Sequence, residues 1–169
     1  MLKNGTQVLV QLHLLNLGKE AVKGDLEINL HRSSITNPRP VNTYIVGSMA
    51  VNLPPMQESE VVANCSAREK VELIAAFPHM HMLGRSMHFA VGKGTNPMTD
   101  LFARDPFDFN DQRMDKVSIS LAQGDKLRLT CKYNNTNATT VTYGESSLNE
   151  MCYLIGFAID RSAQGSCIQ

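Results

Sequence analysis

Several features that would place this chain in a common functional class are missing from its sequence. Acidic and basic residues balance at 16 each, so no net charge attracts nucleic acid or an anionic membrane surface. No apolar run approaches the roughly 20 residues that a membrane-spanning helix needs. The sequence also lacks a glycine-rich phosphate loop, a GxSxG nucleophile elbow and an HExxH zinc helix. These absences direct attention to the cysteines, histidines and methionines.

The four cysteines are widely separated and form no CxxC pair. They are Cys65, Cys131, Cys152 and Cys167. Their spacing argues against a zinc ribbon or a thioredoxin-like redox pair. In a chain rich in strands, an even number of scattered cysteines favours two disulfides, and disulfides indicate an extracytoplasmic protein, either periplasmic or secreted. Buried free thiols remain the alternative.

Hydrophobic alternation predicts β-strands along almost the whole chain. Residues 7–15 and 25–31 predict an N-terminal β-hairpin. Further strands are expected at 43–51, 59–65, 69–79, 85–91, 115–121, 126–133 and 151–159, with an irregular segment at 96–114. Short strands at regular spacing predict an all-β fold, an antiparallel β-sandwich of jelly-roll type.

A segment rich in turn residues, 33–40, predicts a linker. We therefore expect residues 1–35 to be a hairpin and linker left from a preceding domain, and residues 36–169 to be the sandwich domain. Residues 1–5 lack the apolar stretch of a signal peptide, and we interpret this start as a fragment boundary. The hairpin would expose its edges, so pairing with another protomer or docking on the main domain is expected.

The segment PHMHM at 78–82 contains the most informative residues. His79 and His81 are spaced i, i+2, so on an extended chain they point to the same face and are able to hold a metal ion. A thioether from elsewhere would make such a site prefer copper, especially Cu(I). Met151 is a candidate, because it begins the last predicted strand on the opposite face to Cys152. A methionine there is either a ligand or a core residue, and HxH pairs also occur by chance.

Two segments of the chain resemble a known family. HMHMLGR at 79–85 resembles the His-x-His-x-x-Gly segment of the copper type II, ascorbate-dependent monooxygenases, a family that includes peptidylglycine α-hydroxylating and dopamine β-monooxygenase. GESSLNEMC at 144–152 resembles the Gly-x-x-Ser-x-x-Glu-Met-Cys signature of that family. The resemblance covers about residues 40–167, the C-terminal oxygen-activating domain.

The resemblance implies a mononuclear copper site and two disulfides. His79, His81 and Met151 would be the copper ligands, with an open position for dioxygen. The resemblance also implies a Cys131–Cys152 disulfide, which leaves Cys65 to pair with Cys167. In the family, a second copper and an external reductant such as ascorbate supply electrons for hydroxylation of a small organic substrate.

The second copper site is incomplete in this sequence. VLVQLH at 8–13 resembles a family strand whose histidine binds the second copper, so His13 is a possible ligand. The other two family ligands are an adjacent His-His pair, and these 169 residues contain none. Either the half that carries this pair was cut away or the protein never uses it, and we favour truncation of a preceding copper domain. His31 is expected to be solvated, and His88 to pack or hydrogen-bond.

The substrate anchors of the peptidylglycine enzymes are also missing. Their arginine is replaced by Phe77, and their asparagine and tyrosine by Tyr153 and Ile155. These three residues are a candidate pocket for an apolar or aromatic substrate. Three functional hypotheses follow: the oxygen-activating domain of a copper monooxygenase, a non-catalytic extracytoplasmic copper-binding module, and a structural sandwich whose HxH pair is incidental.

Overall fold

The computed structural model describes residues 5–10, 14, 16, 18–31, 34–159 and 165–169. The chain separates into two compact units, Met1–Thr36 and Asn37–Gln169. In the described residues the second unit contains all the strands. They are β1 (Val41–Ser48), β2 (Asn52–Leu53), β3 (Gln57–Ser66), β4 (Val71–His79), β5 (Gly84–Gly92), β6 (Thr99–Arg104), β7 (Asp115–Leu121), β8 (Lys126–Asn135), β9 (Val141–Thr142), β10 (Cys152–Ile159) and β11 (Gly165–Ile168).

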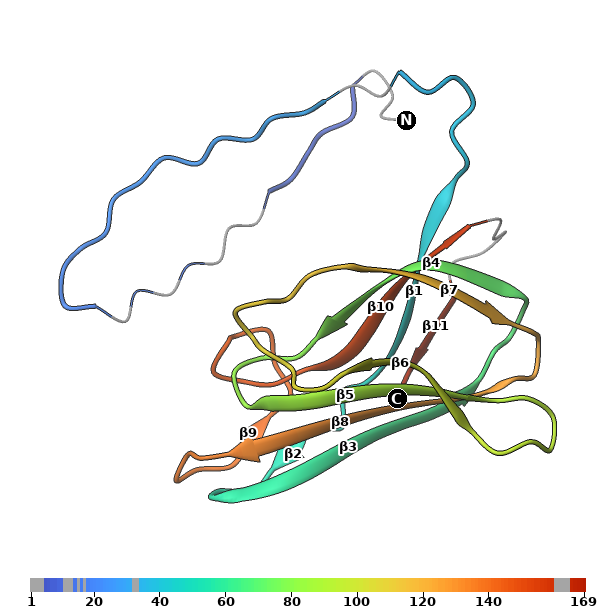
Figure 1. Ribbon diagram of the computed structural model, residues 1–169. Coiled ribbons are helices and arrows are strands. Elements are labelled where there is room, and N and C mark those ends of the chain that lie inside the picture. Colours follow the sequence, from blue (N-terminus) through green and yellow to red (C-terminus); the bar gives the residue numbers. More distant parts are fainter. Residues whose placement is uncertain (1–4, 11–13, 15, 17, 32–33, 160–164) are drawn as a thin grey trace. The chain divides into compact units, whose positions relative to one another are not determined.

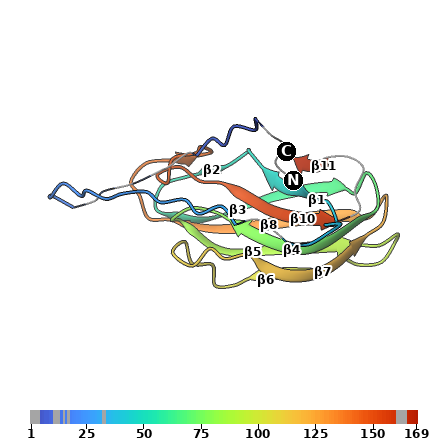
Figure 2. The same cartoon turned by 90° about the horizontal axis from the view of Figure 1, so that it is seen from above.

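The second unit is an all-β sandwich, as the sequence predicts. One layer is a five-stranded sheet of order β11-β1-β10-β4-β7, and the other is a four-stranded sheet of order β3-β8-β5-β6 (Figure 1). Figure 2 shows the same two layers from above. All pairs are antiparallel except β1–β11, which is parallel. The more specific jelly-roll arrangement stays a prediction.

The core lies between the two sheets. Leu73 of β4 and Leu154 of β10 come from the five-stranded sheet, while Phe89 of β5 and Leu129 of β8 come from the other, and all four are at most 2% exposed. Burial alternates along β10, so that Cys152 and every second residue after it face the core. The other face of β10, which begins with Tyr153, is half-buried, and Met151 directly precedes the strand. This confirms the predicted division of the last strand into two faces.

Two disulfides join the sheets. Cys131 of β8 is bonded to Cys152 of β10, and Cys65 of β3 is bonded to Cys167 of β11. Both bonds therefore connect a strand of the four-stranded sheet to one of the five-stranded sheet. The pairing implied by the family resemblance is confirmed, and the alternative of free thiols is wrong.

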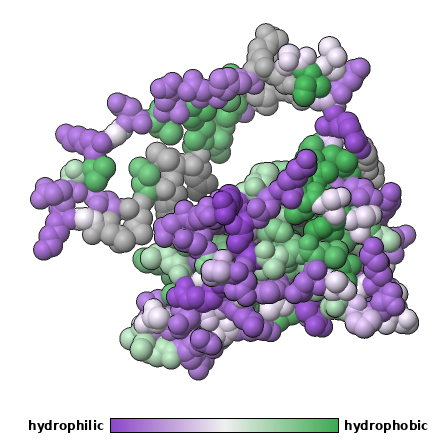
Figure 3. Space-filling model, viewed as in Figure 1, coloured by the Kyte–Doolittle hydropathy of each residue, from purple (hydrophilic) through white to green (hydrophobic). Residues whose placement is uncertain are grey.

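The predicted N-terminal hairpin is not formed in the described residues. Residues 7–10, 14 and 25–31 contain no strand, and the alternating Leu26, Ile28 and Leu30 are all exposed. Figure 3 shows hydrophobic residues at the surface of this unit. The alternation gives strand propensity, but an isolated two-stranded hairpin buries too little apolar surface to be stable. The assignment of residues 1–35 to a preceding domain stays a prediction.

The segment 96–114 is also less irregular than expected. It contains β6, which pairs with β5 at the edge of the four-stranded sheet. The strand was hard to recognise because only Phe102 of its six residues is buried. The rest of the segment runs to β7 and approaches the histidines.

Candidate metal centre

The end of β4 carries the first histidine of the HxH pair. Pairing between β4 and β7 stops at Ala76, whereas pairing with β10 continues to His79. One edge of β4 is therefore free of a strand partner near Pro78, where proline is tolerated because it has no N–H to donate. β4 then leaves the five-stranded sheet, and the turn at 80–83 leads into β5 of the other sheet. His81 lies in this turn and is 4% exposed, while His79 is half-buried.

The two imidazoles lie close to each other. Their ring centres are 5.1 Å apart, with the ring planes at 80°. Two imidazole nitrogens that bind one metal ion at about 2 Å bring their ring centres roughly 5 Å apart. The observed separation therefore fits two histidines that share one ion.

Hydrogen bonds leave the same nitrogen of each ring available. Nδ1 of His81 lies 3.0 Å from the main-chain oxygen of Asn149, which is able only to accept, so Nδ1 carries the proton. Nδ1 of His79 lies 2.9 Å from Oε1 of Gln112. The amide of Gln112 is oriented by its Nε2, which donates to the main-chain oxygen of Phe109 at 3.1 Å. Both histidines therefore have their lone pair on Nε2, the nitrogen a metal would bind.

The electrostatics favour neutral imidazole at His79. Burial lowers its pKa, and the neighbouring His81 lowers it further, while the hydrogen bond to Gln112 acts in the opposite direction. A neutral ring is the form that binds a metal ion. The ring of Phe77 stacks beside His79, with ring centres 6.0 Å apart, and Phe109 meets His81 edge-on at 6.3 Å.

The strand pairing brings the Met151 segment next to the histidines. Tyr153 of β10 is paired with His79 of β4 in antiparallel register. Met151 lies two residues before Tyr153, directly before the start of β10. Met151 is half-buried, and its main-chain oxygen accepts a hydrogen bond from the hydroxyl of Tyr133 at 2.7 Å.

Glu150 is a buried carboxylate between the two segments. It is 0% exposed, and it accepts hydrogen bonds from the main-chain N–H groups of His81 at 2.8 Å and Leu83 at 2.6 Å. Burial raises its pKa to about 7, whereas hydrogen bonds from main-chain N–H groups, including that of Met151, and the charge of Arg85 lower it. Glu150, which directly precedes Met151, therefore contacts the turn that carries His81 through its carboxylate.

Sequence reasoning missed several residues of this centre. Gln112 and Phe109 lie in the segment expected to be irregular, where no pattern shows which side chain returns to β4. Asn149 acts through its main-chain oxygen, which no sequence pattern reports. Glu150 belongs to the segment that resembles the family signature, but no sequence pattern shows that its carboxylate contacts the turn of His81.

The other predicted site residues lie apart from the histidine pair or are not described. His13 lies outside the described residues. His31 is exposed, as expected. His88 lies on β5, where its Nδ1 is 3.1 Å from Oδ2 of Asp100 and its Nε2 is 3.5 Å from Oδ2 of Asp105, so the expectation of hydrogen bonding is confirmed. No group of three or more His, Cys, Asp or Glu side chains in the described residues is arranged to hold a metal ion.

The candidate substrate residues share the outer face of the five-stranded sheet. Phe77 is paired with Ile155, and Tyr153 with His79. All are half-buried. The hydroxyl of Tyr153 donates to that of Tyr143 at 3.0 Å. The structure thus brings the three candidates together beside the histidines.

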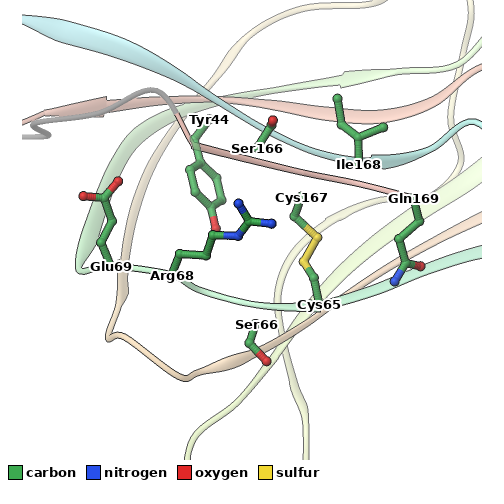
Figure 4. Close-up of a pocket in the computed structure, with 9 residues that line it drawn as sticks. All are labelled: Tyr44, Cys65, Ser66, Arg68, Glu69, Ser166, Cys167, Ile168 and Gln169. Atoms are coloured by element: carbon green, nitrogen blue, oxygen red, sulfur yellow. A yellow bond between two sulfur atoms is a disulfide. The ribbon is translucent and has the colours of Figure 1, made fainter.

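A separate pocket of about 210 Å³ lies beside the Cys65–Cys167 disulfide (Figure 4). Arg68 and Glu69 are its charged residues, and no histidine lines it. It is distinct from the histidine pair.

No helix in the described part of the chain is long and apolar enough to cross a membrane.

The fold is a β-sandwich domain with two neighbouring imidazoles, which lie next to the segment that carries Met151. Residues 41–168 match the family described as copper type II ascorbate-dependent monooxygenase, C-terminal domain. The chain belongs to this family, which confirms the resemblance seen in the sequence.

Two further comparisons were made. The chain is 25% identical over 130 residues to a human protein described as "Putative DBH-like monooxygenase protein 2". The match covers 69% of this chain and 26% of the human protein, so the chain spans about a quarter of that relative. A solved structure titled "Structure of infectious bursal disease virus Gx strain" is 8% identical, with a TM-score of 0.28, over 73% of this chain and 37% of that one. That likeness bears on neither fold nor function.

Proposed function

We propose that residues 36–169 bind one copper ion through Nε2 of His79, Nε2 of His81 and Sδ of Met151. The single observation that carries this proposal is the pair of histidines with both Nδ1 atoms already hydrogen-bonded. Nε2 of each ring is then left to bind a metal ion, and the 5.1 Å between the ring centres supports one ion shared by both. Membership of a copper-dependent family supports the choice of metal.

The third ligand decides the character of the site. A thioether is a soft donor that favours Cu(I) over harder ions. Met151 directly precedes β10 and is half-buried, and its main chain is held by Tyr133. A methionine there leaves the fourth position of the site open for dioxygen.

The activity we propose is hydroxylation of a C–H bond in a small organic substrate. Copper, when bound, would supply one-electron redox chemistry and dioxygen activation, with an external reductant such as ascorbate. The contribution of the chain is to hold the two imidazoles in one tautomer and to surround them with Phe77 and Phe109. These rings exclude water from part of the site.

The substrate side of the site is apolar. Phe77, Ile155 and the ring of Tyr153 form a half-buried surface next to His79. We propose that an apolar or aromatic substrate lies on this surface, because nothing in it matches the arginine anchor of the peptidylglycine enzymes. A substrate that binds through its own carboxylate would find no positively charged partner among these three side chains.

Electron supply requires a second metal site, which we propose is in a preceding domain with His13 as one ligand. The human relative is about four times the length of the matched region, which leaves room for such a domain. Two disulfides support an extracytoplasmic location. Pairing through residues 1–35 is proposed as a route to a homo-oligomer.

A non-catalytic copper-binding module is the second candidate. It needs only the paired histidines and Met151, and all three lie within the residues that match the family. Such a module would use the same three ligands without electron transfer between two coppers. The two candidates therefore differ in turnover and agree on copper binding.

Copper titration of the purified chain tests the common part of both candidates. We expect one Cu(I) per chain, with binding weakened at least tenfold by His79→Ala and by His81→Ala. His88→Ala is the matched control, because His88 is hydrogen-bonded to aspartates on the other sheet, and it should bind copper as the wild type does. Absence of stoichiometric binding by the wild type would refute the proposal.

A second assay separates the candidates. Oxygen consumption with ascorbate and small aromatic substrates would be measured on the chain joined to its natural upstream sequence. Hydroxylated product favours the monooxygenase. Stoichiometric copper without product favours the binding module.

A further inference from the structure

We propose that Glu150 is a positioning residue that holds the turn of His81 at a fixed distance from Met151. This inference rests on the proposed copper site, because its purpose is the geometry of two copper ligands. Glu150 is fully buried and precedes Met151 in the chain.

Each carboxylate oxygen of Glu150 has its own partner. Oε2 accepts from the N–H of His81 at 2.8 Å, and Oε1 accepts from the N–H of Leu83 at 2.6 Å. Both contacts go to the turn between β4 and β5. Both bonds come from one side chain, so they restrain the turn at two points. Because both oxygens are directed to main-chain N–H groups, the carboxylate acts as a clamp on the turn and is not placed as a metal ligand.

The main chain of Glu150 is anchored as well. Its N–H donates to the main-chain oxygen of Thr142 at 3.1 Å, and its own oxygen accepts from the N–H of Gly144 at 3.3 Å. The carboxylate is therefore attached to a fixed support, and its position determines where the turn lies.

The clamp acts across two sheets. Strand pairing holds the chain before and after the turn at 80–83, and the main-chain oxygen of Leu83 accepts from the N–H of Asn134 at 2.9 Å. Glu150 adds the contact that holds the turn at His81. The preceding residue, Asn149, accepts the Nδ1–H of His81 through its main-chain oxygen. Asn149 thus orients the ring of His81, and Glu150 fixes the main chain beneath it.

Glu150→Gln is the sharpest test, since it preserves shape and removes one acceptor. A glutamine places an NH₂ group against one of the two main-chain N–H groups, so one hydrogen bond is lost. We expect Cu(I) affinity to fall about 10- to 100-fold, as for outer-shell partners of metal ligands. X-ray absorption of the Cu(I)-loaded protein should show the sulfur contribution in the wild type and lose it in the variant.

Asn135→Asp is the matched control. Asn135 is also fully buried and anchors a different loop, donating Nδ2–H bonds to Leu53, Pro54 and Thr139 main-chain oxygens. The exchange is again isosteric and again disrupts buried hydrogen bonds. We expect this variant to lose stability, yet to keep its sulfur contribution and a Cu(I) affinity within twofold of the wild type.

An unchanged sulfur contribution and affinity in Glu150→Gln would overturn the proposal, even if its stability fell as in the control. If that variant does not fold, Glu150→Asp takes its place. Aspartate retains both acceptors but is one methylene shorter, so a weakened sulfur contribution is expected, and wild-type binding would overturn the clamp.

The clamp and the proposed function fail in different ways. If the wild-type chain binds no copper, the proposed function is refuted. The contact of Glu150 with the turn of His81 is then tested by NMR in the metal-free protein. We expect Glu150→Gln to shift the amide resonances of His81 and Leu83 and the ring resonances of His81, and Asn135→Asp to leave them in place. Unmoved resonances in Glu150→Gln would overturn the clamp.

Discussion

Oε1 of Gln112 lies 2.9 Å from Nδ1 of His79, and this contact links the segment before β7 to the end of β4. The orientation of the amide is set by its own second bond, from Nε2 to the main-chain oxygen of Phe109. A chain of two hydrogen bonds therefore decides which nitrogen of His79 is free. The segment that sequence patterns describe least well thus determines the tautomer of a candidate ligand.

Replacement of Gln112 by Ala is expected to weaken Cu(I) binding about tenfold, because His79 would no longer be held in one tautomer and orientation. The fold should be unaffected, since Gln112 is only half-buried. Competition with a chromophoric Cu(I) chelator measures the affinity. Gln123→Ala, at an exposed turn position, is the control, and equal affinities in the two variants would contradict the role of Gln112.

Met151→Ile separates the ligand interpretation from the core interpretation. We expect a loss of Cu(I) affinity with little change in the free energy of unfolding, because Met151 is only half-buried. Met80→Ala is the reverse case: Met80 is 0% exposed and its loss should cost about 2–5 kcal/mol while the ligands remain. Urea denaturation and copper titration of both variants provide the check. A large stability loss in Met151→Ile would support the core interpretation instead.

Removal of the Cys131–Cys152 disulfide by a double alanine substitution should destabilise the domain by about 3 kcal/mol, given a sequence separation of 21. Loss of Cys65–Cys167, with a separation of 102, should cost about 4–5 kcal/mol in the same chain-entropy treatment. Only the first bond adjoins Met151, so only its removal should also weaken Cu(I) binding. Equal effects of both double variants on Cu(I) binding would contradict this assignment.

The stability of the copper-free protein should depend on pH through Glu150. Burial raises the pKa of this carboxyl from 4.5 to about 7, so the folded state binds the proton more tightly than the unfolded state. The resulting stabilisation is complete below pH 4.5 and is lost as the pH rises through 7, by at most about 3 kcal/mol. Urea denaturation of wild type and Glu150→Gln across this range measures the difference. Parallel curves would contradict the raised pKa.

Strands with one core-facing side were predictable from sequence. β7 was expected at its observed bounds, and β10 within one residue, because each alternates against a single buried face. β6 was missed because its lone buried residue, Phe102, gives no period. The strands expected at 7–15 and 25–31 have the right alternation, but no core covers Leu26 or its neighbours, so local pattern did not suffice.

The candidate site was predictable only in part, for a related reason. His79, His81 and Met151 stand in recognisable segments, and the family match covers them. The partners that orient them come from distant segments through single contacts, as with Gln112, or through main-chain atoms, as with Asn149. Such contacts depend on the packed fold, and no local period encodes them.

The central claim is one copper ion held between two histidines and a methionine. A crystal of the protein soaked with Cu(I) and measured at the copper absorption edge tests it most directly. We predict one anomalous peak within bonding distance of Nε2 of His79, Nε2 of His81 and Sδ of Met151. A peak elsewhere, or a Met151 sulfur turned away from the two histidines, would contradict the account.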